Sequence, residues 1–309
     1  MPAEADVVVI GAGIVGSCLA AHLGRLGVGR VVLIDKGPLP NPGGSTGHAS
    51  NFIFPIDHSK MMTLLTLDSV AQYEQLGVLT RAGGIEVARQ PERLEELARR
   101  IEAGMVYGEP AELLDPKGVK GLVPFIDESV ILGGMHCPGV GVVDSLRAGT
   151  LLRDEAVAAG RLHISARTEV TGIEVVGGAV RRVQTDRGDV AAGAVVVSCG
   201  VWSPRIAAMA GATIPLTPAV HQMIDVGPVP RFAGSQGEIE FPVVRDVDVN
   251  MYERQHGSEL EIGSYAHRPI LLDPSDIPSN EAAALSPTEM PFTADDFDPQ
   301  MEHALELMP

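Results

Sequence analysis

The sequence predicts an α/β protein that combines a doubly wound parallel sheet with a mostly antiparallel sheet in a second, α+β domain. Three observations predict this fold class. The chain opens with two short apolar runs on either side of a helical pattern, as in a strand–helix–strand unit. Another apolar run, residues 191–198, ends in glycine and leads into a further helical segment. From residue 214 onward, short strand-like segments alternate with Pro and Gly, a pattern typical of antiparallel strands.

The first element is a glycine-rich turn between a buried strand and a helix. Residues 7–10 are all apolar, and Gly11, Gly13 and Gly16 follow in the spacing G-x-G-x-x-G. Glycines at these places allow a tight turn, close approach of a phosphate to the backbone, and close packing of helix on strand. The helix that follows, over residues 14–26, offers free N–H groups and a partial positive charge to an anion.

An acidic residue closes the second strand, over residues 31–34. Asp35 lies nineteen residues after Gly16. There it is placed to hydrogen-bond a ribose 2′-hydroxyl, and its charge would repel a 2′-phosphate. Strand, glycine turn, helix, second strand and terminal acid all fall within thirty-five residues, so we predict a dinucleotide-binding site.

The rest of the chain supplies the elements that complete both sheets. Residues 36–50 are too rich in Gly and Pro for regular structure and form a loop that carries His48. Periodicity predicts helices over residues 61–76, 91–102, 144–159 and 301–307, a turn at 138–141, and strands over 84–88, 130–136, 161–164, 168–174, 179–185, 191–198, 219–226, 242–245, 249–254 and 259–262.

Composition and charge exclude several classes of protein. The 309 residues carry 40 acids against 23 bases, a net charge of −17, which argues against nucleic acid or an anionic membrane as a partner. Three cysteines without C-x-x-C spacing indicate a reducing compartment, with neither a disulfide framework nor a zinc site. The remaining His, Cys and carboxylates show no metal-ligand spacing, so we predict no metal. No signal-like start or long apolar window is present, and we expect a cytoplasmic protein.

Four parts of the sequence together resemble a known family. They are the opening fingerprint, the loop of residues 43–49, residues 195–203, and the region of Tyr252, His256 and residues 263–265. These resemble the flavin-dependent amine oxidoreductases of the D-amino-acid oxidase superfamily, closest to the dimethylglycine oxidase, dimethylglycine dehydrogenase and sarcosine dehydrogenase group. The resemblance covers nearly the whole chain, and the loop around His48 is its most specific part.

The resemblance implies a fold, a reaction and an acceptor. It implies a Rossmann-like FAD-binding domain, over residues 1–82 and 144–214, and a substrate domain with a mostly antiparallel sheet, over 83–143 and 215–309. The implied reaction oxidises the C–N bond of a small N-methylated amino acid by hydride transfer to FAD. Oxygen or an electron-transfer protein would take the electrons, and no motif distinguishes between these acceptors or among the candidate amines.

The resemblance also implies site residues. His48 matches the loop histidine that holds FAD covalently, and His221 and Tyr252 match the residues that face the substrate amine. Arg268 is a candidate for binding a substrate carboxylate. The other positions implied for the cofactor are Gly11, Gly13, Ile14, Val15, Gly16, Asp35, Lys36, Gly44, Ser45, Thr46, Val170, Gly200 and Trp202.

Two alternative hypotheses about the cofactor and the activity remain open at this point. The glycine fingerprint by itself binds either NAD or FAD, and the His48 loop with the antiparallel second domain favours FAD. Family members continue well past the length of this chain, with a segment that completes the flavin site and then a folate-binding domain. The alternative is therefore a non-catalytic or partial flavoprotein, either a subunit or a fragment, that needs a partner chain or the missing C-terminal segment.

Overall fold

The computed structural model describes residues 1–283 and 286–309, which divide into two compact units. Unit 1 comprises Met1–Ala49, Asp144–Val220 and Leu271–Met290, and unit 2 comprises Ser50–Val143, His221–Ile270 and Pro291–Pro309. The units differ from the predicted domains mainly in two segments, because residues 50–82 belong to unit 2 and residues 271–290 to unit 1. Each unit is therefore assembled from three separate stretches of sequence.

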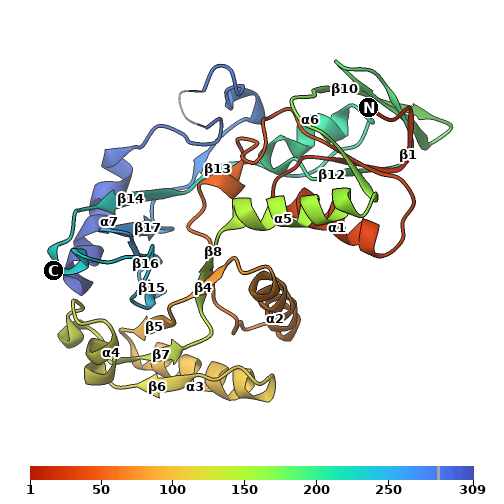
Figure 1. Ribbon diagram of the computed structural model, residues 1–309. Helices are drawn as coiled ribbons and strands as arrows, with labels where there is room; N and C mark the ends of the chain where they lie inside the picture. The colour runs from red at the N-terminus through yellow and green to blue at the C-terminus, as the bar shows by residue number, and fades with distance from the viewer. Residues whose placement is uncertain (284–285) are drawn as a thin grey trace. The chain divides into compact units, whose positions relative to one another are not determined.

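Unit 1 is built on a six-stranded sheet in the order β10-β11-β12-β1-β2-β9. Strands β12, β1, β2 and β9 run parallel, whereas β10, β11 and β12 pair in antiparallel fashion. Helices α1 and α5 lie side by side on one face, and α6 covers the opposite face (Figure 1). The elements are β1 (Glu4–Ile10), α1 (Ile14–Arg25), β2 (Val31–Ile34), α5 (Ser145–Ala158), β9 (Leu162–Ser165), β10 (Val170–Val176), β11 (Ala179–Thr185), β12 (Val190–Val197) and α6 (Ser203–Ala208).

The apolar strands form the core of unit 1. Val8, Val32 and Ile34 are fully buried where the sheet packs against apolar side chains that include Ile206 of α6. Burial on both faces explains why β1 and β2 are continuous apolar runs without alternation. The strand–turn–helix–strand unit predicted from these runs is confirmed, and so is the α/β fold class.

Unit 2 is built on a seven-stranded sheet in the order β14-β17-β16-β15-β5-β7-β6. All its pairs are antiparallel except β15 with β5. A smaller antiparallel sheet in the order β3-β8-β4 belongs to the same unit. The elements are β3 (Phe52–Ile53), α2 (Lys60–Gln75), β4 (Leu79–Arg81), β5 (Gly84–Ala88), α3 (Pro91–Val106), β6 (Glu112–Leu114), α4 (Pro116–Leu122), β7 (Gly133–Cys137), β8 (Gly141–Val143), β14 (Gln222–Val226), β15 (Val243–Asp246), β16 (Met251–His256), β17 (Glu259–Ser264) and α7 (Ala294–Leu307).

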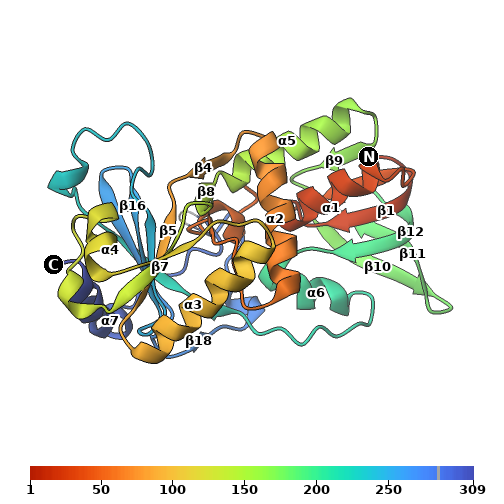
Figure 2. The ribbon, with the colours of Figure 1, turned by 90° about the horizontal axis from the view of Figure 1, so that it is seen from below.

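The two faces of the larger sheet carry different side chains. Ile85, Val87 and Val244 pack against α4 and the C-terminal Leu307, while α3 packs against β5 and β7 (Figure 2). Because side chains alternate along a strand and cross-strand partners share a face, the register places Arg245 and Tyr252 together on the other face. This second face carries the candidate substrate groups.

Several predicted elements differ in their bounds. Helix α7 begins at Ala294 rather than residue 301, because Asp295 and Asp296 favour its first turn despite Pro299 inside the helix. The predicted strand over 219–226 is interrupted at His221, which separates β13 (Ala219–Val220) from β14. Strand β7 starts three residues late, after a short 3-10 helix. The short elements not yet given are β18 (Ile270–Leu271) and the 3-10 helices Ser45–Gly47, Glu128–Val130, Gly200–Trp202, Pro230–Phe232 and Pro274–Asp276.

Within the described residues, no helix combines the length and apolar character that crossing a bilayer requires.

Candidate cofactor and substrate sites

The glycine turn of unit 1 leaves no room for a side chain at Gly11 or Gly16. Gly11 has a φ of 103°, and a Cβ there would lie 2.4 Å from the carbonyl oxygen of Ser198. A Cβ on Gly16 would lie 1.8 Å from the carbonyl oxygen of Gly11. Gly13 precedes helix α1, whose first turn contains no acidic residue and whose Val15 is 68% exposed. Backbone N–H groups at this helix end are suited to an anion.

Asp35 ties the end of β2 to the glycine turn. Its Oδ2 accepts a hydrogen bond from Ala12 N–H at 2.6 Å, and its Oδ1 accepts one from Gly37 N–H at 2.6 Å. Burial raises the pKa of Asp35, and the two backbone donors oppose that rise. Each carboxylate oxygen keeps a lone pair for a ribose hydroxyl. The adjacent Lys36 forms an exposed ion pair with Glu169.

The predicted loop folds against the start of α1. Thr46 Oγ1 accepts a hydrogen bond from Ile14 N–H at 3.1 Å, and the Thr46 carbonyl accepts one from Ser145 Oγ at 2.8 Å. Ser45 begins the short 3-10 helix Ser45–Gly47. Gly44 lies against the ring of Trp202, whose Cζ3 would be 3.7 Å from a Cβ on that glycine. The loop is therefore a structured part of the candidate site.

His48 has one nitrogen in contact and one without a partner. Its Nε2 lies 3.2 Å from Thr288 Oγ1, and its Nδ1 is buried with no hydrogen-bond partner among the described residues. Burial lowers the pKa of His48, while Glu289 acts in the opposite direction. A neutral imidazole with an unpartnered nitrogen is chemically suited to form a bond to an electrophilic carbon. The arrangement thus fits the covalent flavin link expected for this residue.

Val170 and Gly200 stand at the ends of strands in unit 1. The Val170 side chain is buried in the sheet core beside Val8 and Val32, so only its backbone can face a ligand. Gly200 opens the 3-10 helix after β12 and precedes Trp202. Neither position makes a side-chain contact that by itself indicates a cofactor.

The candidate substrate groups of unit 2 form one aromatic cluster. His221 Nε2 lies 3.1 Å from Tyr252 Oη, which also lies 2.6 Å from Ser50 Oγ. The His221 ring stacks on Tyr265 with 4.3 Å between ring centroids, and Phe52 packs edge-on against Tyr252 at 4.8 Å. The interruption between β13 and β14 places His221, and strand β16 places Tyr252.

This environment favours the neutral forms of both groups. Desolvation, with a smaller effect from His267, lowers the pKa of His221, although the residue as a whole is exposed. Burial raises the pKa of Tyr252 far above its ordinary value, so the phenol stays protonated. At neutral pH the pair therefore contains a free imidazole base and a hydroxyl donor.

Arg245 adds a cation to the same sheet face. It pairs across the sheet with Tyr252, its guanidinium carbon lies 4.8 Å above the ring of Phe54, and its Nη1 lies 3.5 Å from Glu86 Oε2. The Arg245 side chain is 33% exposed, so it is accessible to a soluble ligand. Arg268, the carboxylate candidate from the sequence, instead makes two hydrogen bonds to Asp296, at 2.7 and 2.9 Å.

The family model for FAD dependent oxidoreductases, DAO, matches residues 6–309 of the sequence. The chain belongs to the DAO family. Mouse sarcosine dehydrogenase is 33% identical over 283 residues, which make up 87% of this chain and 30% of that protein. Rat dimethylglycine dehydrogenase is 29% identical over 269 residues, 85% of this chain and 31% of that protein. The chain thus spans about a third of the length of these curated relatives.

The fold agrees with the family. The crystal structure of L-proline dehydrogenase from P. horikoshii superposes with a TM-score of 0.82 at 25% identity, covering 100% of this chain and 78% of that one. Membership in the DAO family confirms the resemblance found in the sequence, and it confirms FAD as the cofactor of the family.

Sequence reasoning missed three contacts in this DAO-family chain. Thr288 is about 240 residues from His48 along the chain, and no local motif relates the two. Arg245 lies in a strand whose sequence shows nothing unusual. It lies beside Tyr252 only because β15 pairs with β16. A charged residue such as Arg153 of α5 is expected on the exposed side of a helix, yet it is only 4% exposed. All three depend on tertiary contacts.

One group in the described part of the chain has the atom spacing of a metal site. Asp225, His256 and Glu261 each offer a ligand atom, and these atoms lie within 4.8 Å of one another. Both oxygens of Glu261, however, accept hydrogen bonds from Arg254, at 3.1 and 2.9 Å. A guanidinium in that position disfavours a bound cation.

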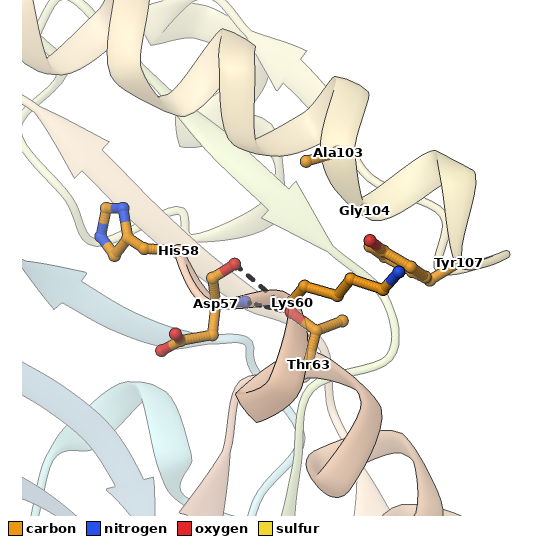
Figure 3. A pocket seen from close by; sticks show the side chains of 7 residues that line it. All are labelled: Asp57, His58, Lys60, Thr63, Ala103, Gly104 and Tyr107. Atoms are coloured by element: carbon orange, nitrogen blue, oxygen red, sulfur yellow. Dashed lines mark hydrogen bonds between the residues drawn. The ribbon is translucent and has the colours of Figure 1, made fainter.

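A small pocket lies in unit 2 between the start of α2 and the end of α3 (Figure 3). The Asp57 N–H donates to Thr63 Oγ1 at 3.2 Å, and Lys60 Nζ lies 6.0 Å from the centroid of the Tyr107 ring. None of the predicted site residues lines this pocket, whose lining is Asp57, His58, Lys60, Thr63, Ala103, Gly104 and Tyr107. It therefore has no part in the candidate site.

Proposed function

We propose that this chain carries the flavin-binding and amine-binding groups of an oxidoreductase that oxidises the C–N bond of a small N-methylated amino acid. The observation that carries the proposal is the combination, on one sheet face of unit 2, of a neutral His221, a protonated Tyr252 and a cationic Arg245. In an N-methylated amino acid, the ammonium proton matches His221, the nitrogen group matches Tyr252, and the carboxylate matches Arg245.

Unit 1 supplies the groups for the cofactor. Backbone N–H groups of the glycine turn and the start of α1 would hold the pyrophosphate, and Asp35 would hold a ribose hydroxyl. His48 would form the covalent link through its unpartnered Nδ1. Bound FAD would supply the hydride acceptor for the reaction.

His221 and Tyr252 prepare the amine. A substrate amine enters as its ammonium form at neutral pH, and its nitrogen lone pair must be free before the adjacent carbon can release a hydride. His221 accepts the ammonium proton at Nε2 or Nδ1, because its lowered pKa keeps it unprotonated. Tyr252 orients the substrate, because its hydroxyl oxygen accepts a hydrogen bond from the ammonium group before the proton moves to His221. Loss of the hydride then leaves an iminium ion, which water hydrolyses.

Spectroscopy during reduction tests the proposal. Protein reconstituted with FAD is mixed under anaerobic conditions with sarcosine or N,N-dimethylglycine, and the visible flavin absorbance is followed. Bleaching by either amine supports the proposal, and bound flavin that neither amine bleaches contradicts it. Adding oxygen or an artificial electron acceptor afterwards identifies which type of acceptor restores the colour.

The covalent link is tested with His48→Ala. After acid precipitation, we expect flavin colour in the wild-type pellet and in the supernatant of the variant, because the variant lacks the bond-forming imidazole. His58→Ala is the matched control, since His58 is exposed and paired with Glu96, and it should keep flavin in the pellet. Wild-type flavin that leaves with the supernatant would refute the link and leave FAD binding intact.

Arg245→Gln tests the carboxylate contact. A charge-assisted hydrogen bond contributes about 1.5–3 kcal/mol, so we expect KM for sarcosine to rise roughly 10- to 100-fold, with a smaller change in kcat. N-methylpropylamine, which lacks a carboxylate, should lose little when Arg245 is replaced. Arg268→Gln serves as control and should leave both amines unchanged. Equal effects of Arg245→Gln on both amines would argue against carboxylate binding.

A partial subunit remains the alternative proposal. The observation that favours it is similarity to a subunit of a multi-subunit enzyme, since the sarcosine oxidase subunit beta of Rhodobacter capsulatus is 28% identical over 227 residues. It predicts that purified protein holds little flavin until a partner chain is added, and that reduction by the amine then appears.

A further inference from the structure

Arg153 is a buried cation beneath the glycine turn of unit 1. It lies on α5, which packs beside α1, and it is 4% exposed. Its Nη1 donates to Ser17 Oγ at 2.7 Å and to the carbonyl oxygen of Ala12 at 3.3 Å, and its Nη2 donates to Thr150 Oγ1 at 3.0 Å. Ala12 is the residue between the first two glycines of the fingerprint. The guanidinium is therefore attached directly to the turn.

The charge of Arg153 has no ionic partner in the described part of the chain. No carboxylate lies within 4.0 Å of its guanidinium there, and all three of its hydrogen-bond acceptors are neutral. Asp154 and Asp35 act on it only through longer-range attraction, and burial lowers its pKa. A buried charge without a close counter-charge destabilises a fold. Packing between α1 and α5 alone does not require it, since an apolar side chain of similar length could fill the space.

The turn keeps its internal bonds without the arginine. Ser17 Oγ itself donates to the Ala12 carbonyl oxygen at 3.0 Å, and Asp35 accepts from Ala12 N–H. Two independent contacts therefore already hold this residue. What Arg153 adds is positive charge in a region of low dielectric, where charges interact more strongly than in water.

We propose that Arg153 is a positioning residue that supplies buried positive charge for the diphosphate of the bound dinucleotide, acting through the Ala12 carbonyl and the turn. The inference rests on the proposed cofactor binding by unit 1. It predicts that Arg153 increases the affinity for ligands that carry phosphate charge and leaves the affinity for uncharged ligands unchanged.

Calorimetric titration of the apoprotein tests the inference with three probes: FAD, ADP and the uncharged adenosine. Arg153→Met should weaken ADP and FAD binding roughly tenfold and leave adenosine unchanged. Arg153→Lys should restore part of the loss. Arg161→Met is the matched control, because Arg161 is exposed and its guanidinium donates to the Gly24 carbonyl of α1. This variant should bind all three probes like the wild type.

Thermal unfolding of the apoprotein separates this function from a structural one. If the charge serves the ligand, Arg153→Met should melt at or above the wild-type temperature, because the desolvated cation is removed. A lower melting temperature together with equal losses for ADP and adenosine would overturn the inference, and so would unchanged ADP binding. A wild-type protein that binds neither ADP nor FAD would refute the proposed cofactor site itself.

Discussion

Gly11→Ala is expected to abolish dinucleotide binding. The new Cβ would lie 2.4 Å from the carbonyl oxygen of Ser198, at the end of the neighbouring strand, and 2.7 Å from its carbonyl carbon. Both atoms are backbone, so the two strands must separate or the turn must move, and the N–H groups at the start of α1 lose their position. We expect no measurable FAD or ADP binding by calorimetry and a clearly lower melting temperature.

Gly27→Ala separates the steric effect from backbone conformation. Gly27 has a φ of 77°, and a Cβ there meets no atom within 4 Å. Its substitution costs only the unfavourable backbone conformation, about 1–2 kcal/mol. We expect the Gly27→Ala protein to melt at a slightly lower temperature and to bind FAD normally. Wild-type affinity in Gly11→Ala would contradict the assignment of the turn to the cofactor.

His221→Ala is expected to lower kcat/KM for sarcosine roughly 100-fold, the usual contribution of a general base. The reason is that the ammonium proton loses its acceptor beside Tyr252. His256→Ala provides a control, because His256 belongs to the same unit but pairs with Asp225 at 3.1 Å. Rates measured at several pH values distinguish a lost base from a disturbed fold.

The pH profile gives the decisive readout for His221. Protonated His221 cannot accept the substrate proton, so wild-type kcat/KM should fall as pH decreases through a pKa below the ordinary 6.5 of histidine. This inflection should disappear in His221→Ala, while any inflection from the substrate amine at higher pH remains. An unchanged acidic inflection in the variant would assign the titration to another group.

The elements predicted best are those specified by local signals. The turn around Gly11, the following helix and the strand before Asp35 are encoded within thirty-five residues, and their bounds agree with the structure to within a few residues. The order of the unit 2 sheet was beyond prediction, because β5 pairs in parallel with β15, with Ile85 opposite Val244. Periodicity identifies a strand and its faces but carries no information about such distant partners.

The candidate site shows the same limit. The sequence names His221 and Tyr252 separately, and only the strand arrangement brings their side chains to 3.1 Å. Arg245 and Arg153 became candidates only through the neighbours that folding gives them. Arg268, the carboxylate candidate from the sequence, forms an ion pair with Asp296 that sequence spacing does not reveal.

The hydrogen bonds of the loop of residues 43–49 join it to a segment that is synthesised much later. The Gly43 carbonyl accepts from Ser286 Oγ at 3.0 Å and from Thr288 Oγ1 at 3.1 Å, and Thr288 also contacts His48. These partners leave the ribosome more than 200 residues after the loop itself. The hydroxyl groups of Ser286 and Thr288 can therefore contact the loop only after this later segment has been synthesised. If His48 carries flavin as proposed, the link in this buried setting would form only after that late segment has been synthesised.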